Sequence, residues 1–154
     1  MSFVSTSTYQ VEMRPRPFSL LFSTRLQPSA LGFLQTDGSF RYNDRISRTA
    51  SLLKNDGEVY RSVKTYFDHK NSYESEWCSI LDGIRFSQEY TGELQLENDN
   101  LSVINCLINE RKPPQSYAAK YYNDVLHASR DMDWLEVRWI PRKLNKADGL
   151  FRIR

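Results

Sequence analysis

The stretch Leu31-Gly-Phe-Leu-Gln-Thr-Asp-Gly38 decides the fold of this chain. Its first six residues form an apolar run of strand length, and Asp-Gly is a common turn signal, so we expect a first β-strand that ends at Asp37. Further strands are predicted at Thr49–Leu53 and Val59–Phe67, with Asn-Asp-Gly as the turn between them. The pattern therefore predicts a meander of three antiparallel strands.

The apolar period becomes helical after this meander. Apolar side chains recur at helical spacing between residues 73 and 90, and Gly92 follows as a helix stop. A short strand at 94–96, helices at 101–108 and about 116–129, a strand at 134–140 and a last short helix from about Asn145 complete the prediction. This order indicates an α/β fold, a mixed five-stranded sheet of three antiparallel and then parallel strands with helices on its faces.

The 154 residues suffice for one domain with a core, since 40% of them are apolar and 26% are charged. Residues 1–30 differ from the rest, because serine, threonine and proline crowd there without either secondary-structure period. We interpret 1–30 as an N-terminal extension and 31–154 as the domain. The apolar group Phe18–Phe22 makes docking of this extension, or an added strand, an open alternative.

Charge and cysteine content exclude several classes. The chain has 21 Lys and Arg against 19 Asp and Glu, so its net charge of +2 is too small to indicate a class of binding partner. Cys78 and Cys106 are too few for a disulfide framework or a cysteine-based zinc site. No apolar run approaches the roughly 20 residues of a membrane span. We expect no membrane partner and an intracellular, cytoplasmic setting, with a nuclear or viral one left open.

Four acids on four different elements carry the chemistry, namely Asp37, Glu76, Asp99 and Asp148. If the first and fourth strands are parallel neighbours, their carboxyl ends meet at one edge of the sheet, where such folds bind ligands. Carboxylates that converge there repel one another unless cations neutralise them. Oxygen ligands suit Mg²⁺ or Mn²⁺, and two such ions can assist phosphodiester hydrolysis.

The residues around these acids resemble the type 1 ribonuclease H family, and more closely its compact plant-like and retroelement-like branch, over about residues 31–152. Thr36-Asp-Gly-Ser39 is similar to the T-D-G-S motif of the first strand, and Glu74-Ser-Glu-Trp77 to the E-A-E-Y start of the first helix. Asn98-Asp-Asn100 resembles the S-D-S end of the fourth strand. Val137-Arg-Trp-Ile-Pro-Arg142 and Asn145-Lys-Ala-Asp148 resemble the closing V-x-W-V-P-R and N-x-x-A-D motifs.

This resemblance implies a ribonuclease H-like fold and a hydrolase, an endonuclease that cuts the RNA strand of RNA/DNA hybrids with two Mg²⁺ ions or Mn²⁺ as a substitute. It implies that all four acids are catalytic metal ligands. Candidate substrate-binding side chains are Ser39, Asn43, Asn71 and Ser72 for RNA 2′-hydroxyls, and Arg142, Lys143 and Lys146 for phosphates. Whether the chain belongs to a larger replication or reverse-transcription assembly stays open.

Three departures from the family concern the substrate and the proton path. No histidine lies between Trp139 and Asp148, where the family often carries one. The motif Asn145-Lys-Ala-Asp148 is one residue shorter than the N-x-x-A-D motif of the family. Some family members carry an inserted cluster of basic residues, the basic handle, and no such cluster lies between Asn105 and Trp134. The alternative is therefore a catalytically weak or inactive ribonuclease H-like module that binds nucleic acid or serves as a scaffold.

Overall fold

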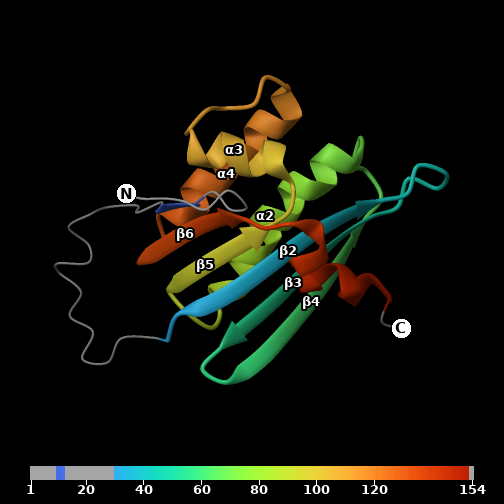
Figure 1. The fold of residues 1–154 in the computed structure, drawn as a ribbon. Coiled ribbons are helices and arrows are strands. Elements are labelled where there is room, and N and C mark those ends of the chain that lie inside the picture. Colours follow the sequence, from blue (N-terminus) through green and yellow to red (C-terminus); the bar gives the residue numbers. More distant parts are fainter. Residues whose placement is uncertain (1–9, 13–29, 153–154) are drawn as a thin grey trace.

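The computed structural model describes residues 10–12 and 30–152, which form one mixed sheet with helices packed against it (Figure 1). The strands are β1 (Gln10–Glu12), β2 (Gly32–Phe40), β3 (Ser47–Asn55), β4 (Glu58–Tyr66), β5 (Glu93–Asn98) and β6 (Trp134–Trp139). The helices are α2 (Ser72–Ser87), α3 (Leu101–Ile108) and α4 (Ser116–Ser129), followed by two 3₁₀ helices, η1 (Arg142–Leu144) and η2 (Lys146–Arg152).

The sheet has the order β1-β6-β5-β2-β3-β4. Strands β2, β3 and β4 are antiparallel, whereas β2 pairs with β5, and β5 with β6, in parallel. The predicted mixed sheet of five strands is therefore confirmed. Residues 10–12 of the extension add a sixth strand, β1, antiparallel to β6. The apolar group Phe18–Phe22 lies outside the described residues.

Strand β2 continues past Asp37, so the prediction that it ends there is wrong. Gly38 pairs with Thr49 and Ser39 with Arg48, which carries the ladder on to Phe40. The Asp-Gly pair is therefore part of a strand and not a turn. Its glycine serves a contact with helix α2, described below, and not a change of chain direction.

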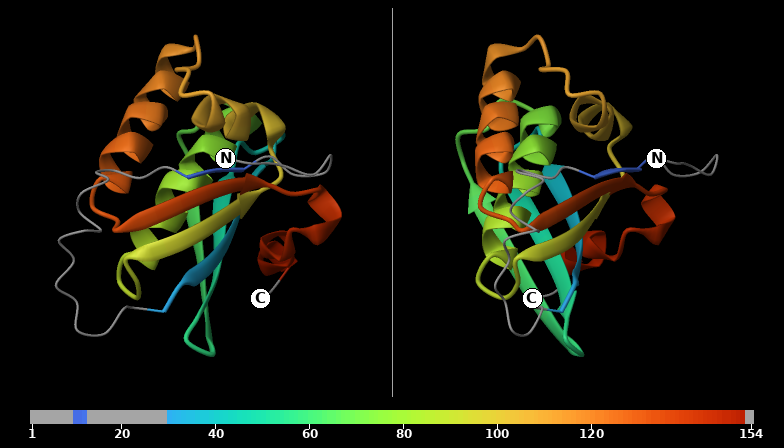
Figure 2. Two further views of the ribbon diagram at one scale, coloured as in Figure 1. Left: turned by 60° about the vertical axis from the view of Figure 1, so that its left-hand side comes forward. Right: turned by 90° about the vertical axis from the view of Figure 1, so that its left-hand side faces the viewer.

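Helices α2 and α4 cover one face of the sheet, and η2 lies against the other (Figure 2). On the helix side, Leu34 and Leu53 face the core with Ile80 and Ile84 of α2, all fully buried. Burying a side chain of this kind contributes roughly 1.5–3 kcal/mol. Because successive residues of a strand point to opposite faces, Asp37 lies on the side of the sheet where η2 packs.

Helix η2 holds to that second face through a small apolar cluster in which Ala147 and Leu150 pack on Ala50 and Leu52 of β3. The prediction of a last short helix from about Asn145 is confirmed in position, with 3₁₀ geometry. This packing fixes where Asp148, one residue beyond Ala147, stands relative to the sheet.

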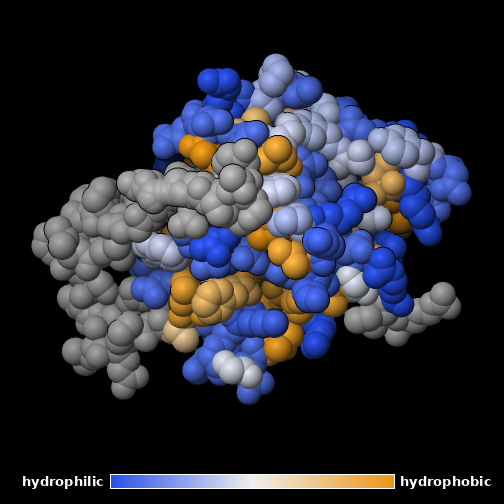
Figure 3. Space-filling model, in the orientation of Figure 1, coloured by the Kyte–Doolittle hydropathy of each residue, from blue (hydrophilic) through white to orange (hydrophobic). Residues whose placement is uncertain are grey.

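The outer surface is mostly hydrophilic in the view of Figure 3, with apolar side chains over the lower part of the sheet. Phe33 of β2 and Val59 and Val63 of β4 are among the exposed apolar residues. Within the described part of the chain, no helix has the length and apolar character that crossing a membrane requires.

Candidate metal centre

Three carboxylates converge at the carboxyl ends of the two central parallel strands. Asp37 comes from β2, Asp99 directly follows β5, and Glu76 reaches them from α2. One oxygen of each lies within 4.8 Å of the others. Asp37 and Glu76 are buried, with 7% and 9% of their surface exposed, and Asp99 is partly buried. The parallel pairing of β2 with β5 is what brings Asp37 and Asp99 together.

Two features of local sequence place Glu76 beside Asp37. Asn71 caps α2, because its Oδ1 accepts the backbone N–H of Glu74 at 2.9 Å, and so sets where the helix begins. Gly38 then lets the helix start touch the strand, since a Cβ at that position would lie 2.6 Å from the backbone of Ser75 and 2.8 Å from the nitrogen of Glu76. Only glycine allows this approach.

Burial and mutual repulsion shift the acids of this cluster toward their protonated forms. Burial, followed by the charges of Asp99 and Asp148, raises the pKa of Asp37 to about 7. The pKa of Glu76 is raised well above its ordinary value, again by burial first and then by Asp37 and Asp99. Burial also raises the pKa of Asp99. Three carboxylates that resist ionisation together form a site that a cation would stabilise.

The donor set matches a hard divalent cation. All three side chains offer oxygen, the ligand that Mg²⁺ and Mn²⁺ prefer. Glu76 Oε1 is buried and has no hydrogen-bond partner, which costs free energy unless a ligand binds it. Asp37, Glu76 and Asp99 would therefore hold such an ion.

Asp148, the fourth predicted acid, stands on η2 next to this group but is not one of the three. Its charge and a side-chain hydrogen bond to Asp37 both raise the pKa of Asp37, which shows how near the two carboxyls lie. Its Oδ2 accepts a hydrogen bond from Arg152 at 3.0 Å, in an ion pair that is largely exposed and therefore weak. Asp148 is thus available at the rim of the cluster.

The side-chain amides of Asn98 and Asn145 hold the residues around the cluster in place. Asn98 is fully buried and donates to the carbonyl and the hydroxyl of Thr36, both at 3.0 Å. Asn145 donates to the same carbonyl at 2.9 Å and to Asp99 Oδ2 at 3.0 Å. Sequence reasoning missed Asn98 as a support, and its place directly before Asp99 is the one signal that could have found it.

The candidates for contact with 2′-hydroxyls gather near the start of α2. Ser39 accepts a hydrogen bond from Ser75 Oγ through its carbonyl, and Tyr42 Oη lies 3.3 Å from Ser72 Oγ, which joins the loop that carries Asn43 to the helix. Asn43 and Ser72 are exposed. Asn71 is already engaged, because its amide also donates to Tyr117 Oη at 3.0 Å.

The three basic candidates lie on η1 and at the start of η2. Arg142, Lys143 and Lys146 are exposed, and the charge of Arg142 is near enough to Asp99 to lower its pKa in part. Arg142 therefore lies near the acidic cluster, and Lys143 and Lys146 are exposed on the same final segment. Sequence reasoning missed the pairing of Asp148 with Arg152, although the spacing of four residues signals such a pair.

His69 is a structural residue. It is 3% exposed, its Nδ1 lies 2.6 Å from Ser47 Oγ, and its ring stacks on Tyr66 at 4.5 Å. A histidine in that position cannot replace the one that is missing from the final loop.

Solved structures with this fold include ribonucleases H. A family model described as reverse transcriptase-like matches residues 35–148, a range that contains all four acids. RNase H1 from the halophilic archaeon Halobacterium salinarum is 16% identical with a TM-score of 0.71, over 78% of this chain and 93% of that one. The N-terminal RNase H domain of a Mycobacterium tuberculosis protein is 17% identical with a TM-score of 0.71, over 79% and 91%.

A third solved structure, LC11-RNase H1 in complex with an RNA/DNA hybrid, is 16% identical with a TM-score of 0.69, over 77% of this chain and 92% of that one. Among curated proteins, none matches the sequence significantly. The fold is therefore ribonuclease H-like, as the sequence predicted. The chain belongs to the reverse transcriptase-like family, on a match that spans most of its length.

Proposed function

We propose that this protein is a metal-dependent endonuclease that hydrolyses the RNA strand of RNA/DNA hybrids by a two-metal-ion mechanism. The observation that carries the proposal is the convergence of Asp37, Glu76 and Asp99 within 4.8 Å at the carboxyl ends of β2 and β5. The solved complex of LC11-RNase H1 with an RNA/DNA hybrid supports the choice of substrate.

The carboxylates supply the ligands for the reaction. Two Mg²⁺ ions, or Mn²⁺ as a substitute, would activate a water molecule and stabilise the leaving oxygen of the phosphodiester. The charges of both Asp99 and Asp148 act on Asp37, so Asp37 is the acid that would serve both ions. Glu76 and Asp99 would complete the ligand set for one ion, and Asp148, paired with Arg152 at the rim, would be a ligand for the other.

The protein surface around the cluster would hold the hybrid. Arg142, Lys143 and Lys146 would neutralise phosphates, while Ser39, Asn43 and Ser72 would offer polar groups to 2′-hydroxyls near the start of α2. Because no basic handle adds further phosphate contacts, affinity should be modest, and each missing contact lowers the salt slope by roughly 0.7–0.9.

Incubation of the full chain with labelled RNA/DNA hybrid, duplex RNA and duplex DNA, with Mg²⁺, Mn²⁺ or EDTA, tests the proposal. We expect cuts in the RNA strand of the hybrid only, with 5′-phosphate and 3′-hydroxyl ends, and no cuts in EDTA. Folded protein that binds hybrid and leaves it intact at every metal concentration would favour the nucleic-acid-binding scaffold instead.

A further inference from the structure

The final loop is held in place by one buried amide. Asn145 is 5% exposed and lies between η1 and η2. Its Nδ2 donates to Thr36 O at 2.9 Å and to Asp99 Oδ2 at 3.0 Å, and its Oδ1 accepts the N–H of Ala147 at 3.1 Å. Both amide hydrogens and the amide oxygen thus have partners, so the group has one orientation.

These three partners belong to the surroundings of three different acids. Thr36 directly precedes Asp37 on β2, Asp99 is itself a candidate ligand, and Ala147 directly precedes Asp148 on η2. One side chain therefore connects three chain segments that converge on the cluster. A buried polar network in which every group is satisfied is rigid, and removal of one member leaves the others unpaired.

We propose that Asn145 is a positioning residue, whose amide sets the distance of Asp99 and of the turn carrying Asp148 from Asp37. This inference rests on the proposed function. In the proposed reaction both ions must stand within a narrow range of geometry, and a displacement of about 1 Å can cost on the order of 10²-fold in rate. Asn145 touches no substrate group and acts only through the carboxylates that it orients.

Gln35 provides a matched control because it anchors the same loop without touching any of the four acids. Its Nε2 donates to Leu144 O at 3.2 Å, and its Oε1 accepts the N–H of Lys146 at 2.8 Å. Gln35 therefore binds the residues on either side of Asn145, whereas Asn145 itself reaches back to Thr36 of β2. Loss of either loosens the loop, but only loss of Asn145 frees Asp99.

The deciding variant is Asn145→Asp, which keeps an oxygen for Ala147 but turns an oxygen toward Thr36 O and Asp99 Oδ2 in place of a donor. We expect Asn145→Asp and Asn145→Ala to lower kcat on RNA/DNA hybrid on the order of 10- to 100-fold, with KM changed less than about threefold. Gln35→Ala should keep kcat within about threefold of wild type, because the side chain contacts the loop and Glu97 of β5 but none of the four acids.

A second readout needs no nucleic acid. The Mg²⁺ midpoint, taken as the dissociation constant fitted to the dependence of Tm on Mg²⁺ concentration, should increase several-fold in Asn145→Ala and stay unchanged in Gln35→Ala. Circular dichroism shows whether each variant is folded, and Asn145→Ala decides the question if Asn145→Asp does not fold.

Wild-type kcat in Asn145→Asp would overturn the inference, because aspartate keeps the bond to Ala147 but loses the two bonds that the amide donates. A Gln35→Ala variant as impaired as Asn145→Ala would overturn it as well. A wild-type protein whose Tm responds to Mg²⁺ but which cuts no hybrid would overturn the proposed function instead. The Mg²⁺ midpoints of the variants would still test the role of Asn145 in that case.

Discussion

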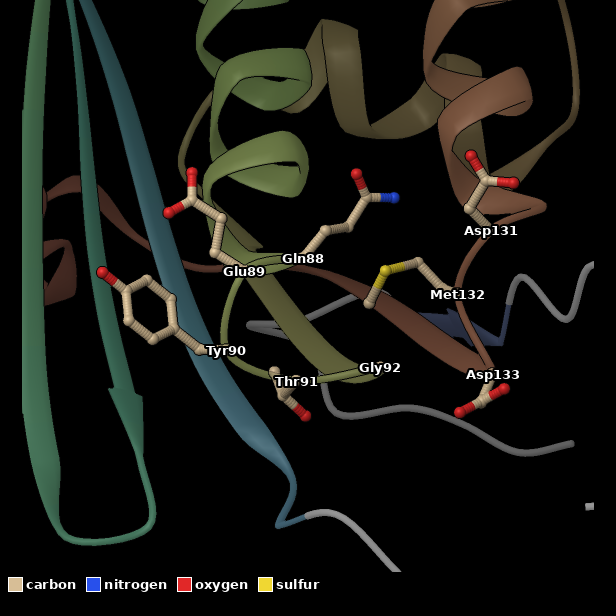
Figure 4. Close-up of a pocket in the computed structure, with 8 residues that line it drawn as sticks. All are labelled: Gln88, Glu89, Tyr90, Thr91, Gly92, Asp131, Met132 and Asp133. Carbon is tan, nitrogen blue, oxygen red and sulfur yellow. The ribbon is translucent and has the colours of Figure 1, made fainter. Parts of the chain in front are cut away.

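The two ends of the sheet both carry acidic residues, but only one end gathers them. At the carboxyl ends of β2 and β5, Asp37, Glu76 and Asp99 are buried or partly buried with oxygens within 4.8 Å. At the opposite end, Glu89 and Asp131 border an open pocket of about 620 Å³ between the ends of α2 and α4, together with Asp133. Figure 4 shows the three carboxylates of that pocket at separate corners, pointing apart.

The difference shows that acidic residues make a candidate cation site only when the backbone holds them together out of water. Parallel strands and the close approach of α2 at Gly38 do this at the first end. At the second end the acids come from loops and helix ends, and their charges are spread over the pocket rim. Exposed carboxylates of this kind are ordinary surface groups.

The largest contrast between the two ends should appear in activity. Asp37→Asn removes the central ligand and should lower the rate of hybrid cleavage on the order of 10³-fold, because metal-ion catalysis contributes several kcal/mol. Asp131→Asn at the opposite end should leave the rate unchanged. Single-turnover cleavage at saturating Mg²⁺ measures both, and near-native turnover in Asp37→Asn would show that the acids are misassigned.

The next largest contrast between the two ends should appear in stability, when a glycine at each end is replaced by alanine. Gly38→Ala places a Cβ against the backbone of Ser75 and should lower the free energy of unfolding by about 1–3 kcal/mol, as overpacking does. In Gly92→Ala the new Cβ meets only the side-chain end of Asp133, which can move, so the loss should be small. Urea unfolding with equal m-values compares them, and equal losses would contradict the close approach of α2.

A pH dependence of metal-free protein should follow from Asp37. Its pKa is about 7 in the folded state against 3.8 ordinarily, so the unfolded chain loses this proton first as the pH rises. The contribution of Asp37 to stability is therefore full below about pH 4 and is lost by about pH 7. In EDTA, the Tm of wild type should fall relative to Asp37→Asn over this range, whereas parallel curves would place Asp37 in a solvated setting.

The smallest expected effect is stabilisation by the metal itself. Mg²⁺ at ten times its dissociation constant adds about 1.4 kcal/mol, or roughly 3–6 °C in Tm, by binding the folded state. Asp99→Asn should lose most of this rise and Asp131→Asn should keep it. If Mg²⁺ leaves the calorimetric Tm of wild type unchanged, neither group of acids binds the ion.

Much of the fold could be predicted because hydrophobic period is local information. The alternation in Val59–Phe67 and the helical spacing after Tyr73 specify strand and helix without knowledge of any distant residue. The predicted end of β2 is wrong because it depends on a contact with a distant segment. Asp-Gly is a turn signal by its neighbours alone, and only the helix packed against Gly38 shows why a glycine stands inside a strand.

The sequence by itself determined the order of the elements and the fold class, since each depends on residue type and spacing along the chain, and the resemblance of its motifs predicted four acids. The tertiary structure alone decided which acids share a site. It buries Asp37, Glu76 and Asp99 together, leaves Asp148 paired with Arg152 at the rim, and joins Asn145 to Asp99 across 46 residues. Burial and contact between distant segments arise only when the chain packs, and they set the pKa of Asp37 and the orientation of Asp99.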